Sequence, residues 1–199
     1  MEYYYTIENE SVAEYKDRGS TFIAFAYPIK YAADFKPILA ELKKLHPKAV
    51  HHCFAYRIGL TGDVFRVSDD GEPSGTAGRP ILGQIDSKNL TNVCIIVVRY
   101  FGGTLLGVPG LIKAYKTVSS LALQTVPTIQ KQRETEVLIN FEYAQTNEVL
   151  SILKNYNATI IEQELHLFPF IKASIPAIRM EEIISKMKSL SNVEFKNLV

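Results

Sequence analysis

The run from Asn92 to Tyr100 constrains the fold more than any other part of the chain. Its centre, Val93–Val98, is apolar at every position and shows no alternation. A strand with one face in water would alternate apolar and polar residues, so this run predicts a strand that is covered on both faces. A chain of 199 residues that is 47% hydrophobic is long enough to build the layers that such a strand needs.

The periodicity of the other apolar residues places further elements around this strand. Alternation predicts strands at Tyr3–Glu8, Val12–Lys16, Ser20–Pro28, Val50–Gly59 and Val64–Val67. Apolar spacings of three and four predict a helix over Ala32–His46. The glycine- and proline-rich Ser68–Pro80 is typical of a loop, and a short helix is expected from near Thr76 to Ile85. A long helix is predicted to begin at Gly107 or Gly110 and to run to about Thr125.

The last third of the chain has a different order of elements. The pattern predicts strand, helix, strand, strand, helix, strand at Glu136–Tyr143, Gln145–Tyr156, Ala158–Glu164, Leu167–Ile175, Arg179–Ser189 and Asn192–Leu198. This β-α-β-β-α-β order is a ferredoxin-like arrangement. The segment Val126–Arg133 contains a proline and a polar run, which favours a short linker. We therefore predict two domains, residues 1–130 and residues 134–199, in an α+β protein.

Charge and composition exclude several classes. The net charge of +1 conceals an asymmetry, because residues 1–133 hold 16 Lys and Arg against 12 Asp and Glu, whereas residues 134–199 hold 6 against 9. The first part is suited to an anionic partner, although its charge is far from that of a histone-like binder. The apolar runs are too short to span a membrane, and the N-terminus lacks the pattern of a secretory signal, so a cytoplasmic location is expected. The two cysteines, Cys53 and Cys94, show no zinc-ligand spacing.

An acidic loop precedes the central strand. Its candidate site residues are Asp69, Asp70, Gly71, Glu72, Gly75 and Thr76. Three carboxylates close together could bind a divalent cation through oxygen ligands, but the spacing is not that of an EF-hand. The alternative is that these residues form turns and cap a helix. We expect no metal and no cofactor.

A glycine-rich segment follows the central strand and leads into the long helix. Glycines allow a close approach of backbone N–H groups to a ligand, and a helix N-terminus favours negative charge. The candidate residues for binding an anionic partner are Arg57, Arg79, Arg99, Tyr100, Gly102, Gly103, Gly107, Gly110 and Lys113. Neither the P-loop spacing nor the dinucleotide fingerprint is present. Tight packing of a strand-to-helix turn remains the alternative.

Two histidines, His51 and His52, begin another predicted strand. Strand geometry places His51, Cys53, Ala55 and Arg57 on one face and His52, Phe54 and Tyr56 on the other. One histidine is therefore expected to pack inside while the other supports the site. No partner at ligand spacing marks either of them as a metal ligand, and adjacent strand residues are poorly placed for a Cys–His pair.

These segments resemble the Impact/YigZ family. The resemblance rests on His51–Arg57, on Asp69–Pro80, and on Val97–Gly103 with Leu106-Gly107, Gly110-Leu111 and Ala114-Tyr115. It covers about residues 1–130 strongly and residues 134–199 more weakly. The family usually has glycine where this chain has Pro109, which removes one N–H donor from the expected anion cradle.

The resemblance implies a fold and a function. It implies a first domain like the second domain of ribosomal protein S5, a second that is ferredoxin-like, and together a likeness to the last two domains of the translocation elongation factor. Eukaryotic relatives restrain a stress kinase that acts on translation initiation, by competing for its ribosome-associated activator. That role does not transfer directly, because this chain lacks the extra N-terminal domain of those relatives. The implied partners are RNA, the ribosome, or a protein in translation control.

Three functions from different classes remain open on the sequence. The first is an RNA- or ribosome-associated regulator, with Arg57, Arg79, Arg99 and Lys113 on phosphate and Tyr100 or Phe101 stacked on a base. The second is an enzyme acting on a small phosphorylated substrate, with Asp70 or Glu72 holding a cation or serving as base. The third is a protein-interaction adaptor, which requires an exposed apolar patch. A structural alternative for Arg99 is an ion pair with Asp69 or Asp70.

Overall fold

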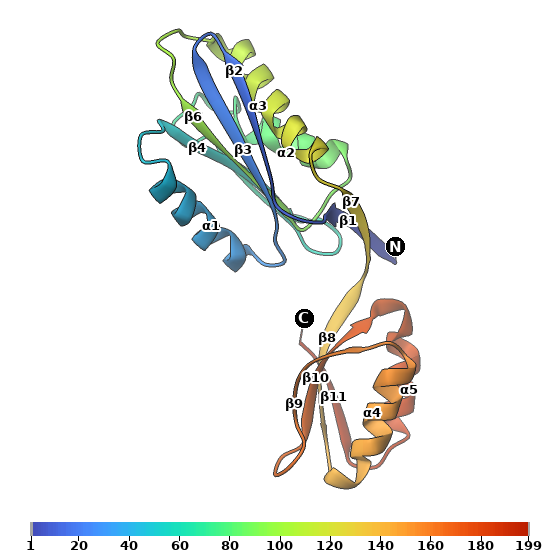
Figure 1. Ribbon diagram of the computed structural model, residues 1–199. Helices are drawn as coiled ribbons and strands as arrows, with labels where there is room; N and C mark the ends of the chain where they lie inside the picture. The colour runs from blue at the N-terminus through green and yellow to red at the C-terminus, as the bar shows by residue number, and fades with distance from the viewer. Residues whose placement is uncertain (1, 199) are drawn as a thin grey trace. The chain divides into compact units, whose positions relative to one another are not determined.

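The computed structural model describes residues 2–198, and this part of the chain is a mixed α/β protein with several sheets and five α-helices (Figure 1). It divides into two compact units. The N-terminal unit is Tyr4–Lys131, and the C-terminal unit is formed by residues 132–198 with residues 2–3.

A five-stranded antiparallel sheet forms the centre of the N-terminal unit. Its strands are β2 (Ser11–Asp17), β3 (Ser20–Pro28), β4 (His51–Ile58), β5 (Val64–Ser68) and β6 (Val93–Tyr100). The order across the sheet is β2-β3-β6-β4-β5. The apolar run that we expected to be covered on both faces is β6, the middle strand, and Val93 to Val98 are fully buried.

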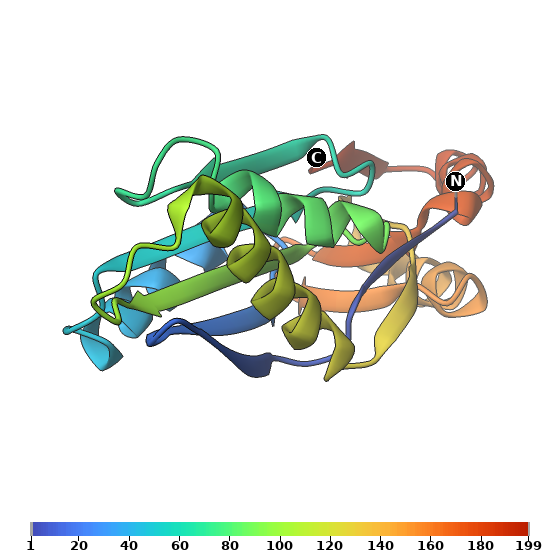
Figure 2. The ribbon, with the colours of Figure 1, turned by 90° about the horizontal axis from the view of Figure 1, so that it is seen from above.

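Helices cover both faces of this sheet. They are α1 (Ala32–Leu45), α2 (Gly78–Ser87) and α3 (Gly107–Gln124). Figure 2 shows α2 and α3 in front of the sheet and α1 behind it. The core under α2 and α3 is the larger one and contains Cys53 and Ala55, whereas the core under α1 contains Phe54 and Tyr56. The predicted alternation of β4 is thereby confirmed.

The register of the central strands brings distant segments together at one end of the sheet. His51 at the start of β4 lies opposite Arg99 at the end of β6, and Thr21 near the start of β3 lies opposite Tyr100. The connections that leave these strand ends are residues 18–19, 46–50, 69–77 and 101–106. We call this the loop end of the N-terminal unit.

The C-terminal unit has one four-stranded antiparallel sheet. Its elements are β8 (Glu134–Phe141), the 3₁₀ turn η1 (Tyr143–Gln145), α4 (Thr146–Asn155), β9 (Thr159–Glu164), β10 (Phe170–Pro176), the 3₁₀ turn η2 (Ala177–Arg179), α5 (Met180–Lys188) and β11 (Val193–Asn197). The strands lie in the order β11-β8-β10-β9. The predicted succession of strands and helices is confirmed. Buried residues of both helices, such as Leu153 and Ile183, pack with Ile139 and Ile171 of the sheet.

The segment that we expected to be a plain linker contains a strand. Thr128–Gln132 is β7, and it pairs with β1 (Tyr3–Ile7) in a separate two-stranded sheet. The sequence Thr-Ile-Gln-Lys-Gln carries one apolar side chain, so periodicity could not reveal a strand that is defined by its backbone pairing. Among residues 2–198 we find no helix with the length and apolar character that crossing a membrane requires.

Candidate functional site

A buried ion pair lies beneath the loop end. Arg99 is 5% exposed and donates from Nη1 to Oε1 of Glu72 at 2.6 Å, and Glu72 itself is 8% exposed. The same carboxylate oxygen accepts a hydrogen bond of 2.8 Å from the hydroxyl of Tyr115 in α3. The acidic loop, the end of β6 and the long helix are therefore joined through one carboxylate. We call Glu72, Arg99 and Tyr115 the buried network.

The guanidinium of Arg99 also contacts the β2–β3 hairpin. Its Nη2 lies 3.4 Å from Oγ of Ser20, and the same hydroxyl accepts from the backbone N–H of Gly102 at 3.2 Å. The carbon Cζ of Arg99 lies 5.3 Å from the ring centroid of Phe22 and 5.6 Å from that of Phe101. With its charge paired and its surface covered, Arg99 holds the loops together and is not open to a phosphate.

The placement of Arg99 corrects one expectation directly. Its carboxylate partner is Glu72 and not Asp69 or Asp70. Asp69 and Asp70 bind backbone groups of the loop and of β4, while the side chain of Glu72 points into the core. The geometry thus favours a structural ion pair for Arg99, as the sequence left open, but with Glu72 as the partner.

Asp69 organises the start of α2. Its carboxylate accepts from the backbone N–H groups of Gly75, Ala77 and Gly78 at 2.8 to 3.0 Å. Burial by itself would raise the pKa of Asp69, but these three N–H groups, with Arg79 adding a smaller effect, hold the pKa below its ordinary value. Thr76 supports the same turn by donating to the carbonyl of Pro73 at 2.7 Å. Gly75 adopts a φ of 78°, which favours glycine.

Asp70 and the two histidines connect the acidic loop to β4. A carboxylate oxygen of Asp70 accepts the backbone N–H of His52 at 2.6 Å. The carbonyl of Asp70 lies 2.7 Å from Nδ1 of His51. A carbonyl can only accept, so Nδ1 carries the proton, and Nε2 of His51 then faces Oε1 of Glu72 at 3.9 Å. Gly71 fits here because a Cβ would come within 3.3 Å of the His51 ring.

The two histidines lie on opposite faces, as alternation predicts. His51 faces the acidic loop, whereas His52 is 7% exposed and lies on the α1 face of the strand. Burial lowers the pKa of His52, and the positive charge of Lys43 lowers it further. His52 is therefore the histidine that packs inside, and His51 is the one that supports the loop.

The three carboxylates of the acidic loop do not form a metal-binding group. Asp69, Asp70 and Glu72 are directed to different partners, and no group of three His, Cys, Asp or Glu suitable for a metal ion occurs among residues 2–198. The geometry corresponds to the turn and capping roles that the sequence offered as the alternative.

Cys53, which lies beside the buried network, and Tyr115 within it both have raised pKa values. Sγ of Cys53 lies 3.2 Å from the hydroxyl oxygen of Tyr115 and 2.9 Å from the carbonyl of Asp69. Burial raises the pKa of Cys53. Burial also raises the pKa of Tyr115, and the negative charge of Glu72 raises it further. Neither group ionises near neutral pH, so Cys53 lacks the thiolate that nucleophilic catalysis needs.

The glycines of the segment after β6 serve different purposes. A Cβ on Gly102 would lie 1.9 Å from the carbonyl carbon of Gly19, so this glycine permits two backbones to meet. A Cβ on Gly110 would lie 2.9 Å from Cβ of Leu106, which also indicates close packing. Gly103 and Gly107 have φ values of 85° and 69°, and their surroundings are open. Packing explains the first pair, while backbone conformation explains the second.

The surface of the loop end carries both basic and apolar side chains. Arg79 is exposed in the first turn of α2, and Lys113 is exposed in the second turn of α3. Phe101 is 47% exposed and Leu105 is 82% exposed. Tyr100 is turned to the other face of the sheet, where its hydroxyl lies 2.8 Å from Nδ1 of His46.

Arg57 does not join the other candidates. It pairs in register with Val93, at the opposite end of β4 from His51. Its Nε donates to Asp86 at 2.7 Å, it also bonds the carbonyl of Gly62, and its Cζ lies 5.2 Å from the Phe65 ring. Six residues of strand span about 20 Å, so Arg57 and the loop end contact different surfaces.

Tyr115 is the residue of this region that our list of candidates missed. It was visible only as part of the motif Ala114-Tyr115, and helix periodicity assigns it to the core. A buried tyrosine requires a partner for its hydroxyl, which is the signal that could have identified it.

Comparison with known proteins gives the family. Residues 18–123 match the Impact N-terminal domain. The IMPACT family member YigZ of Escherichia coli K12 is 34% identical over 178 residues, which cover 88% of this chain and 86% of that protein. YvyE of Bacillus subtilis 168, also named as an IMPACT family member, is 30% identical over 163 residues, 82% of this chain and 74% of that protein.

A solved structure agrees along the whole chain. A crystal structure described as that of a hypothetical protein is 30% identical, has a TM-score of 0.79, and covers 100% of this chain and 98% of its own. Together with the matched residues 18–123, these similarities confirm the resemblance carried by the loop-end motifs, and the chain belongs to the Impact family.

Proposed function

We propose that this protein is an RNA- or ribosome-associated regulator linked to translation, which binds an anionic partner at the loop end. Family membership supports the link to translation, because translation control is what resemblance to this family implies. We also infer that the N-terminal domain, residues 1–130, resembles the second domain of ribosomal protein S5. The C-terminal domain, residues 134–199, would be ferredoxin-like, which the strand order β11-β8-β10-β9 supports. Such a regulator would work in the cytoplasm.

The observation that carries this proposal is the exposed start of α3. The helix begins at Gly107 without a side-chain cap, so N–H groups of its first turn have no partner from a capping side chain. An uncapped N-terminus of an 18-residue helix favours negative charge. Lys113 is exposed in the second turn of this helix, and Phe101 is 47% exposed, which leaves part of its ring accessible for stacking. Pro109 supplies no N–H, so fewer donors are offered than in relatives with glycine there.

The role of Arg99 in this proposal differs from that of Lys113. Lys113 of α3 and Arg79 of α2 are exposed cations in the helices that follow the loop-end segments, and they would meet phosphate. Arg99, paired with Glu72 at 2.6 Å, positions Phe101 and the hairpin from below. Partner binding would therefore respond to Lys113 through charge and to Arg99 through the integrity of the loops.

Binding to ribosomes and to RNA tests the proposal. The full chain should bind at low salt, and affinity should fall as salt rises because counterions are released from phosphates. Lys113→Ala should weaken binding, whereas Lys131→Ala, an exposed lysine of β7, should not. Absence of affinity for both ribosomes and RNA at low salt would show that the proposed function is wrong.

A protein partner at the same loop is a second candidate. The apolar side chains of Phe101, Leu105 and Val108 are 47%, 82% and 51% exposed. Exposed apolar groups that lie close together in the chain favour a protein-interaction adaptor. Binding of such a partner would persist in high salt, and Leu105→Ser would weaken it.

The enzyme alternative receives less support from the geometry. A general base or nucleophile must be able to reach a substrate. Glu72 is committed to Arg99 and Tyr115, and Cys53 is buried with a raised pKa. A panel of phosphorylated compounds tested for a shift in Tm would support this alternative if one of them stabilised the protein.

A further inference from the structure

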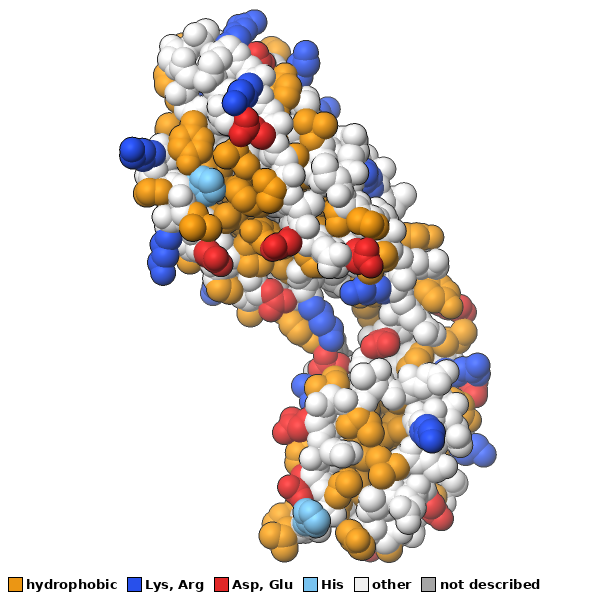
Figure 3. All heavy atoms as spheres, in the orientation of Figure 1, with side chains coloured by type: hydrophobic (Ala, Val, Ile, Leu, Met, Phe, Trp, Pro, Cys, Tyr) orange, Lys and Arg blue, Asp and Glu red, His pale blue; other side chains and the backbone are white. Residues whose placement is uncertain are grey.

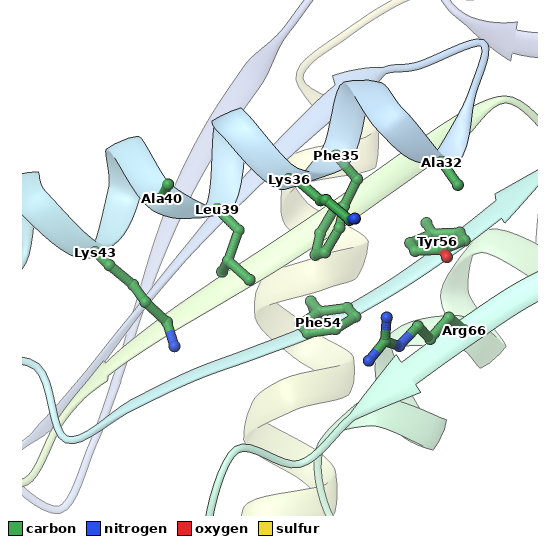
Figure 4. Close-up of a pocket in the computed structure, with 9 residues that line it drawn as sticks. All are labelled: Ala32, Phe35, Lys36, Leu39, Ala40, Lys43, Phe54, Tyr56 and Arg66. Carbon is green, nitrogen blue, oxygen red and sulfur yellow. The ribbon is translucent and has the colours of Figure 1, made fainter.

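A second surface of the N-terminal unit lies between α1 and the strands β4 and β5. It is a hollow of about 390 Å³ (Figure 4). Phe35, Leu39 and Phe54 lie around its apolar interior, with Tyr56 beside them. Its volume falls within the range of about 300 to 1,000 Å³ that is usual for ligand sites. We call it the α1 hollow.

The charged side chains of the α1 hollow are all basic. Lys36 and Lys43 come from α1, Arg66 comes from β5, and no aspartate or glutamate is among the lining residues. Figure 4 shows the side chains of Lys43, from α1, and Arg66, from β5, on opposite sides of Phe54. The spacing of seven between the lysines places them on the same side of the helix, two turns apart.

These cations are weakly paired compared with others in the chain. Lys36 forms no ion pair with any residue from 2 to 198, and Lys43 approaches the Asp70 carboxylate only to 4.0 Å with both side chains partly in solvent. The guanidinium of Arg66 lies 5.9 Å from the ring centroid of Phe54. By contrast, Arg99 and Arg57 each have a carboxylate at 2.6 to 2.7 Å. The positive charge of the α1 hollow is therefore available to an anion.

We propose that the α1 hollow binds single-stranded RNA, with the three cations on phosphates and the apolar interior against a base. This inference rests on the proposed function for its choice of RNA, but it assigns a surface away from the glycine-rich loop. Grooves that hold single strands combine positive charge with aromatic side chains. The rings of Phe54 and Tyr56 are nearly parallel, with an interplanar angle of 6°. They form part of one wall, and because each residue is 7% exposed a base would meet the rings only at their exposed margin.

The positive charge and the apolar interior of the α1 hollow together favour single-stranded RNA over other ligands. An acidic peptide would satisfy the cations, but it need not bring a flat apolar group to Phe54 and Tyr56. A double-stranded RNA presents phosphates while its bases remain stacked inside. A single strand offers both groups. The Lys43 end lies within 4.0 Å of Asp70, so the α1 hollow adjoins the acidic loop, and a strand bound in it can continue to the loop end.

The test compares charge-matched variants of the full chain. One variant replaces Lys36, Lys43 and Arg66 with alanine. The control replaces three exposed lysines outside the α1 hollow, Lys16, Lys44 and Lys116, with alanine, so that both variants lose the same formal charge. Affinity for a fluorescent oligouridylate is measured by anisotropy, and urea unfolding establishes that both variants are folded.

The expected result is a loss of affinity of about tenfold or more for the hollow variant, from removal of three phosphate contacts, and a clearly smaller loss for the control. Phe54→Leu, which keeps an apolar side chain but removes the ring, should also weaken binding of single-stranded RNA. Equal losses in the two triple variants would overturn the inference, as would tighter binding of an acidic peptide than of the oligouridylate.

The failures of the two proposals can be told apart. If the wild type binds ribosomes or RNA but the hollow variant binds as well as the control, the inference is wrong and the proposed function stands. If the wild type binds ribosomes but not single-stranded RNA, the inference about the α1 hollow is again wrong and the proposed function stands. If the wild type binds neither, both are wrong.

Discussion

The buried network and the α1 hollow place positive charge in opposite circumstances within one unit. Arg99 is almost completely buried, and its guanidinium meets Glu72 at 2.6 Å. Lys36 and Arg66 are exposed around an open hollow that contains no acid. Figure 3 shows, on one face of the N-terminal unit, hydrophobic side chains with separate Lys and Arg side chains at its margins. The difference is that one set of charges is used inside the protein, while the other is left for solvent or a partner.

This contrast separates a family motif from a binding surface. Residues 69–80 and 97–115 carry motifs by which the chain resembles its family. Several of their polar side chains form hydrogen bonds within the protein. Burying an ion pair seldom adds net stability over an apolar core, whereas removing one of its partners is strongly destabilising. We infer that the buried network sets the loop geometry, whereas exposed residues recognise the partner.

The largest expected effect comes from breaking the buried ion pair. Arg99→Ala leaves the Glu72 carboxylate buried with only Tyr115 as donor, and should lower the free energy of unfolding by about 3 to 5 kcal/mol. Urea unfolding measures this change. Replacing the exposed Arg79 with alanine is the control, and it should change the free energy of unfolding by at most about 0.5 kcal/mol. A stable Arg99→Ala protein that had lost only partner binding would reverse our distinction between the two regions.

Removing the tyrosine hydroxyl should have a smaller effect on the same network. Tyr115→Phe keeps the ring, which packs against Phe22 at 5.2 Å between centroids, but it deletes one donor to Glu72. The expected loss is about 1 to 3 kcal/mol, measured by urea unfolding. A loss equal to that of Arg99→Ala would mean that the hydroxyl, and not the ion pair, holds the network together.

The contribution of the acidic loop to the free energy of unfolding should depend on pH. The native pKa of Asp69 lies below its ordinary value of 3.8, so the stability from the ionised carboxylate is complete above that value and is lost as the pH falls through the native pKa. Asp69→Asn should cost about 1 kcal/mol at neutral pH, a typical value for a lost helix cap. When unfolding is measured at decreasing pH, the difference in free energy of unfolding between the wild type and Asp69→Asn should become smaller. A difference that does not change with pH would argue against a charged cap.

The smallest effect on stability is expected in the α1 hollow. Alanine at Lys36, Lys43 and Arg66 removes exposed charges, of which that of Lys43 approaches the Asp70 carboxylate only to 4.0 Å. Each change should therefore alter the free energy of unfolding by at most about 0.5 kcal/mol. Urea unfolding of the triple variant provides the comparison with Arg99→Ala. A large destabilisation would indicate that these cations are structural, like Arg99.

Much of the fold could be predicted from local patterns. The unbroken apolar run of β6, the alternation of β4 and the element order of the C-terminal unit depend on residues that are close in sequence. β7 was missed because its pairing with β1 joins segments more than 100 residues apart and leaves no periodic signal. Backbone pairing of a polar strand cannot be read from side-chain character alone.

The sequence predicts that the acidic loop and the end of β6 belong together, but it does not predict the contacts between them. The sequence offered an ion pair between Arg99 and an acid of the loop. Only the three-dimensional structure shows that the partner of Arg99 is Glu72. Arg57 was grouped with Arg99 although the strand register separates them. Lys36 and Lys43 could have been noticed from their spacing of two helical turns, but Arg66 joins them only through the packing of α1 beside β5.

The salt dependence of RNA binding tests most directly whether the free cations, and not the paired ones, recognise the partner. For single strands, the plot of log affinity against log salt concentration steepens by about 0.7 for each phosphate neutralised. We predict that replacing Lys36, Lys43 and Arg66 with alanine makes this slope shallower by about 2, while the Lys16, Lys44 and Lys116 control keeps the wild-type slope. A hollow variant with the wild-type slope would contradict the account.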